Sequence, residues 1–329
     1  MDIEQELINK CLEENLKTYN IHSGERAFVL ATGPSSSEMN LTFLENELSV
    51  GINYFCKHPN INQIKPKYYI AAHPSIFECT EESDGYIMMR GMEQLKDITR
   101  FFFPLNYAKK TMDDPVYKPF KRNYYVCDHS GKKNQSINFG ALLPPWSQNV
   151  LILSIMLSIH LGAKEIYLVG ADNGGLLEMP GRSHFYDKYD YVGDVYSTDF
   201  YKEAKYIVLN QLHQLKAYAE ANGVSIFTTS KTGSFKLFPY IRYETLFRER
   251  ILNESKKALN SFNSENYSDT IEIISSIETL NEIPQNLFLT KSMAYHKIGR
   301  IDQAKKTILK ELTFYPENTL ASSFLEQLN

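Results

Sequence analysis

The sequence predicts an α/β protein with an open, mostly parallel, doubly wound sheet and a C-terminal α-helical region. Short apolar runs that end in polar turns alternate with helical segments along the first 250 residues, which is typical of parallel strands linked by helices. One of these runs, Ile166-Tyr-Leu-Val169, is almost continuously apolar, as expected of a strand buried on both faces. After residue 250 the strand signals stop, and only helical periodicity remains.

The N-terminal half begins with a helix and continues with strands. Apolar residues recur at helical spacing over residues 1–19, and Ser23-Gly24 ends this segment. Strands are predicted, in chain order, over residues 27–31, 49–53, 68–72 and 85–90. Helical turns are expected between them over residues 41–48 and 74–78. Residues 101–138 are rich in Tyr, Lys, Asn and Pro and have weak periodicity, so we expect a loop or a mobile subdomain there.

The second part of the sheet region has clearer signals. A helix is predicted over residues 147–161, with Ser147 as its N-cap and Gly162 at its end. We expect His160, inside this helix, to be a packed core residue. A strand follows over residues 165–170, then a long helix over residues 200–222 that is closed by Gly223, then a last strand over residues 224–228.

The change of character along the chain predicts three parts: an N-terminal helix over residues 1–22, an α/β domain over residues 23–250 and a helical domain over residues 251–329. In the helical part Asp269 and Asp302 are 33 residues apart, and Pro284 and Pro316 are 32 apart. This tail resembles tetratricopeptide repeats, whose period is about 34 residues. Fewer than three repeats are marginal alone, so we expect the tail either to pack on the α/β domain or to form a dimerisation or docking surface. An unrelated helical cap is the alternative.

Charge and cysteine usage narrow the class of protein. The net charge of −4 provides no basic field for nucleic acid. The four cysteines are scattered, with no CxxC pair, which argues against a cysteine zinc site. Scattered thiols and no recognisable signal peptide predict a reducing compartment, and no apolar run is long enough to span a bilayer. We therefore expect a cytoplasmic protein, either free or peripheral at the inner face of the membrane.

Polar residues gather where this fold class binds ligands, beyond the carboxyl ends of the strands. The turn Thr32-Gly-Pro-Ser35 follows a buried strand and opens a helix, so its N–H groups and hydroxyls suit a phosphate. The residues expected to line the site, at strand ends or at the N-terminus of the helix predicted from residue 147, are Thr32, Gly33, Pro34, Ser35, Asn53, His73, Ser147, Gln148, Asn149, Gly170, Asp172, Asn173 and Gly174. They predict a nucleotide or nucleotide-sugar site.

The common motifs of other nucleotide and hydrolytic enzymes are absent from the sequence. Without GxxxxGK[ST] a P-loop kinase is disfavoured, and without GxGxxG after the first strand a dinucleotide enzyme is disfavoured. There is no Asp-x-Asp pair of the kind that holds a divalent metal on a diphosphate sugar. HExxH and the nucleophile-elbow pattern are also missing. What remains is a nucleotide site that does not depend on metal.

Several segments, in order along the chain, resemble one superfamily. Thr32-Gly-Pro-Ser35 is similar to the Gly-Pro-Ser turn of the bacterial sialyltransferases of glycosyltransferase family 42. Residues 161–172 look like the central helix and strand of that family, and Ser183-His-Phe-Tyr186 looks like its His-Tyr segment. Residues 217–247 resemble the DUF115 (MptE-like) proteins, which include the Maf flagellin glycosyltransferases. The resemblance spans about residues 26–248 and implies a single Rossmann-type, GT-A-like domain of the sialyltransferase-like form.

The resemblance implies an inverting glycosyltransferase that moves a CMP-activated nonulosonic sugar, such as a sialic acid, to a surface glycan, a lipid oligosaccharide or a protein. CMP leaves as a monophosphate, so no cofactor or metal is implied. His184 would be the general base, since an imidazole that titrates near pH 6.5 is largely neutral in the cytoplasm. A surface loop histidine is the alternative interpretation of His184.

The same resemblance assigns roles to the binding residues. Gly33, Ser35 and residues 147–149 would hold the phosphate and cytidine, and Asn53 is similar to an Asn that contacts the nucleotide or sugar. His73 stands where the family carries another Asn, which leaves the identity of the donor sugar open. Asp172, Asn173 and Gly174 would line the donor pocket, although Asp172 could instead cap the next turn.

Two other functions stay open at this point. The MptE branch of DUF115 transfers pyrophosphate from ATP to a pterin and requires Mg²⁺, for which Asp172 with Asp187 or Asp190 could supply carboxylates. A non-catalytic scaffold that binds a protein partner through its helical tail is the third hypothesis, and the intact Thr32–Ser35 turn argues against it. The tyrosine-rich residues 186–196 are either an acceptor lid or a polar loop.

Overall fold

The computed structural model describes residues 3–72, 76–77, 84–125, 149–172, 184–185, 199–231, 236–278 and 284–329. The chain divides into two compact units. Met1–Ser37 and Leu41–Ile241 form the first, which we call the sheet unit. Glu38–Asn40 and Arg242–Asn329 form the second, which we call the helical unit. The boundaries expected from the sequence at residues 22 and 250 stay a prediction.

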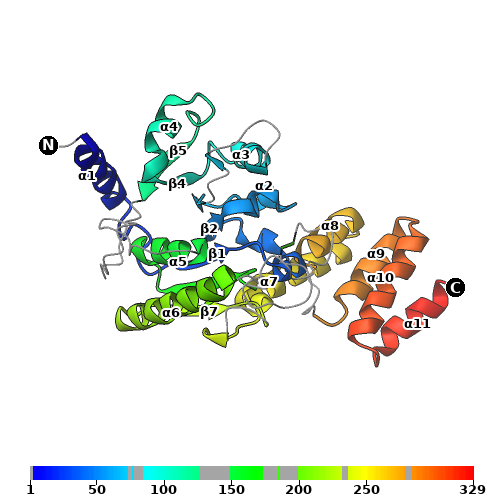
Figure 1. Ribbon diagram of the computed structural model, residues 1–329. Helices are drawn as coiled ribbons and strands as arrows, with labels where there is room; N and C mark the ends of the chain where they lie inside the picture. The colour runs from blue at the N-terminus through cyan, green and yellow to red at the C-terminus, as the bar shows by residue number, and fades with distance from the viewer. Residues whose placement is uncertain are drawn as a thin grey trace. The chain divides into compact units, whose positions relative to one another are not determined.

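The sheet unit is built on one open sheet of seven strands in which every neighbouring pair is parallel (Figure 1). The strand order is β5-β4-β3-β2-β1-β6-β7. The strands are β1 (Arg26–Leu30), β2 (Leu48–Ile52), β3 (Tyr68–Ile70), β4 (Arg100–Pro104), β5 (Lys121–Tyr125), β6 (Glu165–Val169) and β7 (Ser225–Thr228). The predicted α/β class with an open parallel sheet is confirmed.

Two helices cover one face of this sheet (Figure 1). Helix α5 (Val150–His160) is almost entirely apolar and buried, and α6 (Asp199–Ala221) packs beside it. Their side chains join alternate residues of the central strands in the main core, for example Val29, Val50 and Leu168. Gly162 and Gly223 follow the two helices with φ of 100° and 67°, which confirms both as the predicted helix ends.

The opposite face of the sheet is aromatic and is covered by short elements. Tyr69 shows how they are held: its hydroxyl donates to the Asn53 carbonyl (2.6 Å) and accepts from the Cys56 N–H (2.7 Å). The remaining elements of this unit are α1 (Ile3–Leu16), α2 (Ile61–Ile64), α3 (Asp84–Glu93), α4 (Ala108–Asp113) and the 3₁₀ turns η2 (Leu41–Leu44), η3 (Asn53–Lys57) and η5 (Leu105–Tyr107). The 3₁₀ turn η1 (Pro34–Glu38) begins in this unit and ends in the other.

Three predictions about elements are wrong. Residues 85–90 form part of helix α3 rather than a strand, because the run Tyr86-Ile-Met-Met89 suits a buried helix face as well as a strand. Where a loop or a mobile subdomain is expected over residues 101–138, the described residues 100–125 contain β4 and β5. The sheet buries Phe101, Phe102 and Phe103, which overrides the weak local periodicity. Helix α5 begins at Val150, and its N-cap is Asn149 rather than Ser147.

The N-terminal helix α1 is fixed to the edge strand β5 by a buried polar cluster. The Asn15 amide donates to the Tyr124 carbonyl (2.7 Å), and the Asn123 amide donates to Asn15 Oδ1 (2.9 Å). His160, at the end of α5, is 2% exposed and hydrogen-bonds the Asn15 carbonyl through Nε2 (3.1 Å). The prediction that His160 is a core residue is confirmed. No helix among the described residues combines the length and apolarity needed to cross a membrane.

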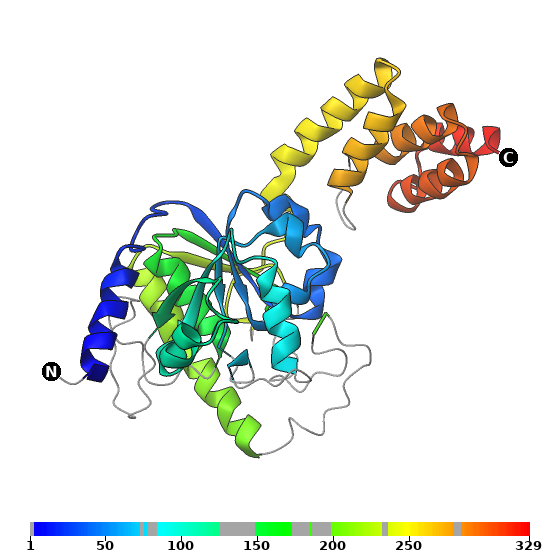
Figure 2. The same cartoon turned by 90° about the horizontal axis from the view of Figure 1, so that it is seen from above.

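The helical unit consists of consecutive antiparallel helices (Figure 2). They are α7 (Arg248–Asn263), α8 (Tyr267–Ile277), α9 (Leu287–Lys297), α10 (Ile301–Phe314) and α11 (Thr319–Gln327), preceded by the 3₁₀ turn η7 (Tyr243–Phe247). Leu289, Ala304, Ile308 and Ala321 form a small core between the last three helices.

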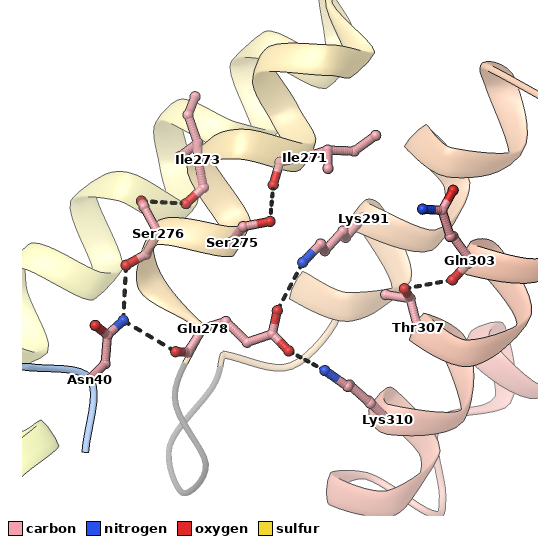
Figure 3. Close-up of polar contacts among 10 residues, drawn as sticks. All are labelled: Asn40, Ile271, Ile273, Ser275, Ser276, Glu278, Lys291, Gln303, Thr307 and Lys310. Atoms are coloured by element: carbon pink, nitrogen blue, oxygen red, sulfur yellow. Dashed lines mark hydrogen bonds and ion pairs between the residues drawn. The ribbon is translucent and has the colours of Figure 1, made fainter. Parts of the chain in front are cut away.

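Charged and polar contacts join the helices of this unit (Figure 3). Glu278, just after α8, forms ion pairs with Lys291 of α9 (2.8 Å) and with Lys310 of α10. Burial raises the pKa of the Glu278 carboxyl, but the two ammonium groups outweigh it and leave the pKa below its usual value. The Asn40 amide donates to the carbonyls of Ser276 (3.0 Å) and Glu278 (3.2 Å) at the end of α8. Contacts between residues far apart in the sequence therefore hold this unit together.

Candidate functional site

The turn after β1 lies against the strand ends of β6. The Ala31 N–H donates to the Val169 carbonyl and the Gly33 N–H to the Gly170 carbonyl, each at 2.8 Å. A Cβ on Gly33 would lie 2.3 Å from Asp172 Oδ2 and 2.4 Å from the Gly170 carbonyl oxygen. Residue 33 is thus a glycine because the two segments approach too closely for any side chain.

The Asp172 carboxylate bonds the turn directly. Its Oδ2 accepts from the Ser35 N–H (2.8 Å), and its Oδ1 accepts from the Ser35 hydroxyl (2.7 Å) and from the Ser230 hydroxyl. Asp172 is buried, so these charge-assisted bonds lie in a medium where they are strong. One carboxylate therefore joins the carboxyl ends of β1, β6 and β7.

This arrangement differs from the phosphate cradle expected at the same turn. The N–H and hydroxyl of Ser35 are both engaged by Asp172, and the Ser36 hydroxyl donates to the Gly33 carbonyl (2.7 Å). A phosphate at this turn would meet the negative charge of Asp172. The structure thus shows that Asp172 holds the turn after the neighbouring strand β1. This contact resembles a cap, but it joins residues that are 137 apart in the sequence.

His184 lies beside the same turn. Its Nδ1 is 2.9 Å from the hydroxyl oxygen of Thr32, and the N–H of Phe185 donates to the Thr32 carbonyl (2.9 Å). Thr32 and His184 are both half-buried. The structure thus brings together the candidate base and the first residue of the Thr32–Ser35 turn. A hydroxyl can donate or accept, and if it accepts from Nδ1–H, the basic lone pair of the imidazole is on Nε2.

Asn53 occupies the carboxyl end of β2. Its backbone is left-handed, with φ of 39°, a conformation that Asn tolerates better than most residues. Its Oδ1 accepts from the Ala72 N–H (3.0 Å), and its carbonyl accepts from the Tyr69 hydroxyl. Asn53 therefore ties the end of β2 to the end of β3.

Two further predicted residues have local structural roles. Asn149 caps α5, since its Oδ1 accepts from the Leu151 N–H (2.8 Å). Gly170 has φ of 67°, and a Cβ there would lie 2.6 Å from the Ala31 carbonyl oxygen. Pro34 opens the turn η1. The other predicted residues, His73, Ser147, Gln148, Asn173 and Gly174, lie outside the described residues, as do Asp187, Asp190 and the segment 186–196.

The structure adds residues that were not in the predicted set. Ser230 follows β7 and bonds Asp172; its position after a strand is a signal that the sequence contains. His58 is 4% exposed, stacks on Phe55 and meets Phe185, the neighbour of His184. Nothing in the local sequence marks His58. In the described part of the chain, no group of three or more His, Cys, Asp or Glu side chains is arranged to hold a metal ion.

No protein-family model matches the chain, and no curated protein matches it. Two solved structures are similar: the sialyltransferase CstII from Campylobacter jejuni in complex with the substrate analogue cytidine-5'-monophosphate, and the same enzyme with CMP-3FNeuAc. The first has 16% identity and a TM-score of 0.38 over 67% of this chain and 85% of that chain. The second has 15% identity and a TM-score of 0.41 over 66% and 86%.

Proposed function

We propose that this chain is an inverting glycosyltransferase that transfers a CMP-activated nonulosonic sugar to a surface glycan, a lipid oligosaccharide or a protein. The observation that carries the proposal is the 2.9 Å contact between the Thr32 hydroxyl and His184 Nδ1, beyond the carboxyl end of β1. It joins the Thr-Gly-Pro-Ser turn to the histidine of the Ser-His-Phe-Tyr segment, two of the segments that carry the family resemblance.

In this mechanism His184 Nε2 removes the proton of the acceptor hydroxyl. The acceptor oxygen then forms a bond to the anomeric carbon of the sugar, while the bond between that carbon and the phosphate oxygen breaks. CMP leaves with the electron pair of that bond, and the proton stays on the imidazole until it passes to water. Thr32 accepts from Nδ1–H and so keeps the lone pair on Nε2, where it can take the proton of the acceptor hydroxyl.

The donor is held by residues at the strand ends. Because the Asp172 carboxylate bonds Ser35, we propose that it shapes the turn and that the phosphate is held at the N-terminus of α5, residues 147–149, where the helix dipole favours an anion. We propose that Asn53, which follows β2, and Gly170, which follows β6, bind the sugar. His73, Asn173 and Gly174 keep the donor-binding role that the resemblance implies. CMP departs as a monophosphate, so the proposal needs no cofactor and no metal.

Nucleotide binding tests this proposal against the alternatives. Thermal unfolding of the protein is measured with CMP, CDP and ATP, each with and without Mg²⁺. A ligand at about 100 times its Kd stabilises the folded state by about 2.7 kcal/mol, which raises Tm by several degrees. We expect this rise with CMP in the absence of Mg²⁺. A rise only with ATP and Mg²⁺ would instead support the pterin pyrophosphokinase, and no response to any nucleotide would support a non-catalytic scaffold.

The role of His184 is tested by His184→Gln. This variant keeps a hydrogen-bonding side chain but no proton acceptor of suitable pKa, so transfer should fall by about 100- to 10,000-fold. The CMP-induced rise in Tm should remain. His213→Gln, an exposed histidine on α6, is the matched control and should behave as wild type. Transfer within a few-fold of wild type in His184→Gln would remove His184 from the mechanism.

The location and the tail complete the proposal. We propose that the enzyme acts in the cytoplasm or at the inner face of the membrane. The helices α7–α11 would form a tetratricopeptide-like surface for a protein partner or a second copy of the chain. The short connections between α7 and α8, between α9 and α10 and between α10 and α11 support this proposal.

A further inference from the structure

His58 is enclosed by two aromatic rings. Its imidazole stacks on Phe55, with ring centroids 5.2 Å apart and planes at 14°. Phe185 meets it edge-on, at 5.3 Å and 72°, and also meets Phe55 edge-on at 6.1 Å. Edge-to-face arrangements of this kind fix the orientation of the rings as well as bury them. His58 therefore contributes directly to the position of Phe185.

One ring nitrogen of His58 has a backbone partner. Nδ1 accepts from the Asn60 N–H at 3.2 Å, so in the neutral ring the proton is on Nε2. Burial lowers the pKa of His58 to about 4, and the backbone of Ser36 offsets only part of this effect. The ring is thus neutral at ordinary pH.

Phe185 links His58 to the candidate site. It follows His184, and its N–H donates to the Thr32 carbonyl. A path of contacts therefore runs from His58 to Phe185 and on to the Thr32 carbonyl, while the adjacent His184 meets the Thr32 hydroxyl.

We propose that His58 is a positioning residue that holds the 184–185 segment against the turn after β1 and thereby sets the place and tautomer of His184. The proposal rests on the proposed function insofar as His184 is the general base. His58 itself touches no substrate. Its effect on His184 passes through Phe185.

Two variants distinguish the packing of the His58 ring from its hydrogen bonding. His58→Ala removes both, whereas His58→Phe keeps a ring against Phe55 and Phe185 and loses the hydrogen bond to the Asn60 N–H. His160→Ala is the matched control, because His160 is also buried and hydrogen-bonded. It lies at the C-terminal end of α5, whereas the proposed donor site lies at the N-terminal end of that helix. A loss caused only by lower stability would appear in the His160 variant as well.

The first readout is the ¹⁵N NMR spectrum of the His184 imidazole in the folded full-length protein, assigned with His184→Gln. It requires no substrate. We expect one defined tautomer in wild type, in His58→Phe and in His160→Ala, and an averaged tautomer in His58→Ala. A folded His58→Ala with the wild-type His184 signals would overturn the proposal, even if the chain proves not to be a transferase.

The second readout is release of CMP from CMP-N-acetylneuraminate in the presence of an acceptor. Misplacing a catalytic group by about 1 Å costs about 100-fold, so kcat of His58→Ala should fall by about 10- to 100-fold with KM nearly unchanged, and His58→Phe should recover most of it. An equal loss in both His58 variants would overturn the positioning role of the ring. If wild type releases no CMP, the proposed function fails while the NMR result still decides the positioning.

A second pair of variants covers the case in which His58→Ala does not fold. Phe185→Leu removes the edge-on ring while keeping an apolar side chain of similar size. Phe227→Leu is its control, since Phe227 is also half-buried and stacks on Tyr167 at 5.3 Å, on β6 and β7. We expect the averaged His184 tautomer in Phe185→Leu alone. The same wild-type spectrum in both variants would overturn the proposal.

Discussion

Gly33 illustrates how one residue combines a local and a distant requirement. A Cβ at this position would enter the space of the Asp172 carboxylate. That carboxylate can accept from the N–H and hydroxyl of Ser35 only because the turn lies this close to it. The absence of a side chain at residue 33 and the presence of an acid at residue 172 are therefore one feature, although the sequence shows them as two unrelated turn residues.

The buried neutral His58 predicts a pH dependence of stability. The unfolded chain binds a proton near the ordinary pKa of 6.5, but the folded chain binds it only near pH 4. Between these values the unfolded state holds more protons, so acidification destabilises the fold. From pH 7 to pH 5 this single group should remove about 2 kcal/mol from the free energy of unfolding.

Urea unfolding at the two pH values measures this effect, with His58→Phe as the comparison. The variant lacks the group, so its loss on acidification should be smaller than that of wild type by about 2 kcal/mol. His160, whose pKa burial also lowers, is unchanged in both proteins and cancels from the difference. Equal slopes in wild type and His58→Phe would contradict the assignment.

At the scale of elements, sequence patterns predicted the helices and strands correctly where a turn residue such as glycine marks the end of an element. Gly162 and Gly223 ended their helices as predicted, and β1, β2, β3, β6 and β7 fall on predicted apolar runs. They failed for α3, where an apolar run suits either a buried helix or a strand. They also failed for β4 and β5, which lie in a region of weak periodicity and form only by pairing in the sheet.

In the helical unit, the Glu311 side chain of α10 caps the N-terminus of the neighbouring helix α9. It is fully buried, and its carboxylate accepts from the N–H groups of Asn286 (2.7 Å) and Phe288 (3.1 Å) at the beginning of α9. The Asn318 amide donates to the same carboxylate (2.8 Å). A carboxylate at a helix N-terminus bonds amides that have no partner within the helix and opposes the positive end of its dipole.

Glu311→Ala should therefore destabilise the helical unit by about 3 kcal/mol, because buried donors lose a charged acceptor. Calorimetric unfolding of the full chain measures it as a lowered Tm of one transition. Glu317→Ala, which changes an exposed residue a few positions later, is the control and should shift Tm little. A similar small shift in both variants would show that Glu311 does not cap α9.

At the scale of the whole molecule, the chain passes between its two compact units three times. Glu38–Asn40 belongs to the helical unit, although the residues on both sides of it belong to the sheet unit. Asn40 donates to two carbonyls at the end of α8 and accepts from the Tyr243 hydroxyl at 3.2 Å. The helical unit thus includes three residues that come shortly after the Thr32–Ser35 turn in the sequence.

Asn40→Ala should weaken the end of α8 without unfolding the chain. Loss of two hydrogen bonds of about 1 kcal/mol each speeds local opening by about 10-fold or more. Hydrogen exchange of the amides in the last turn of α8 measures this opening. Asn46→Ala, an exposed asparagine between η2 and β2, is the control. Unchanged exchange in Asn40→Ala would mean that α8 holds its end without residue 40.

The sequence by itself determined the fold class, the positions of five strands and the turn Thr32-Gly-Pro-Ser35 at the end of the first. These features depend on residues that are close along the chain, where periodicity and turn chemistry act. Only the tertiary structure decided that Asp172 bonds Ser35 and that His58 meets Phe185. Contacts between such distant residues follow from strand order and side-chain packing, which no local pattern encodes.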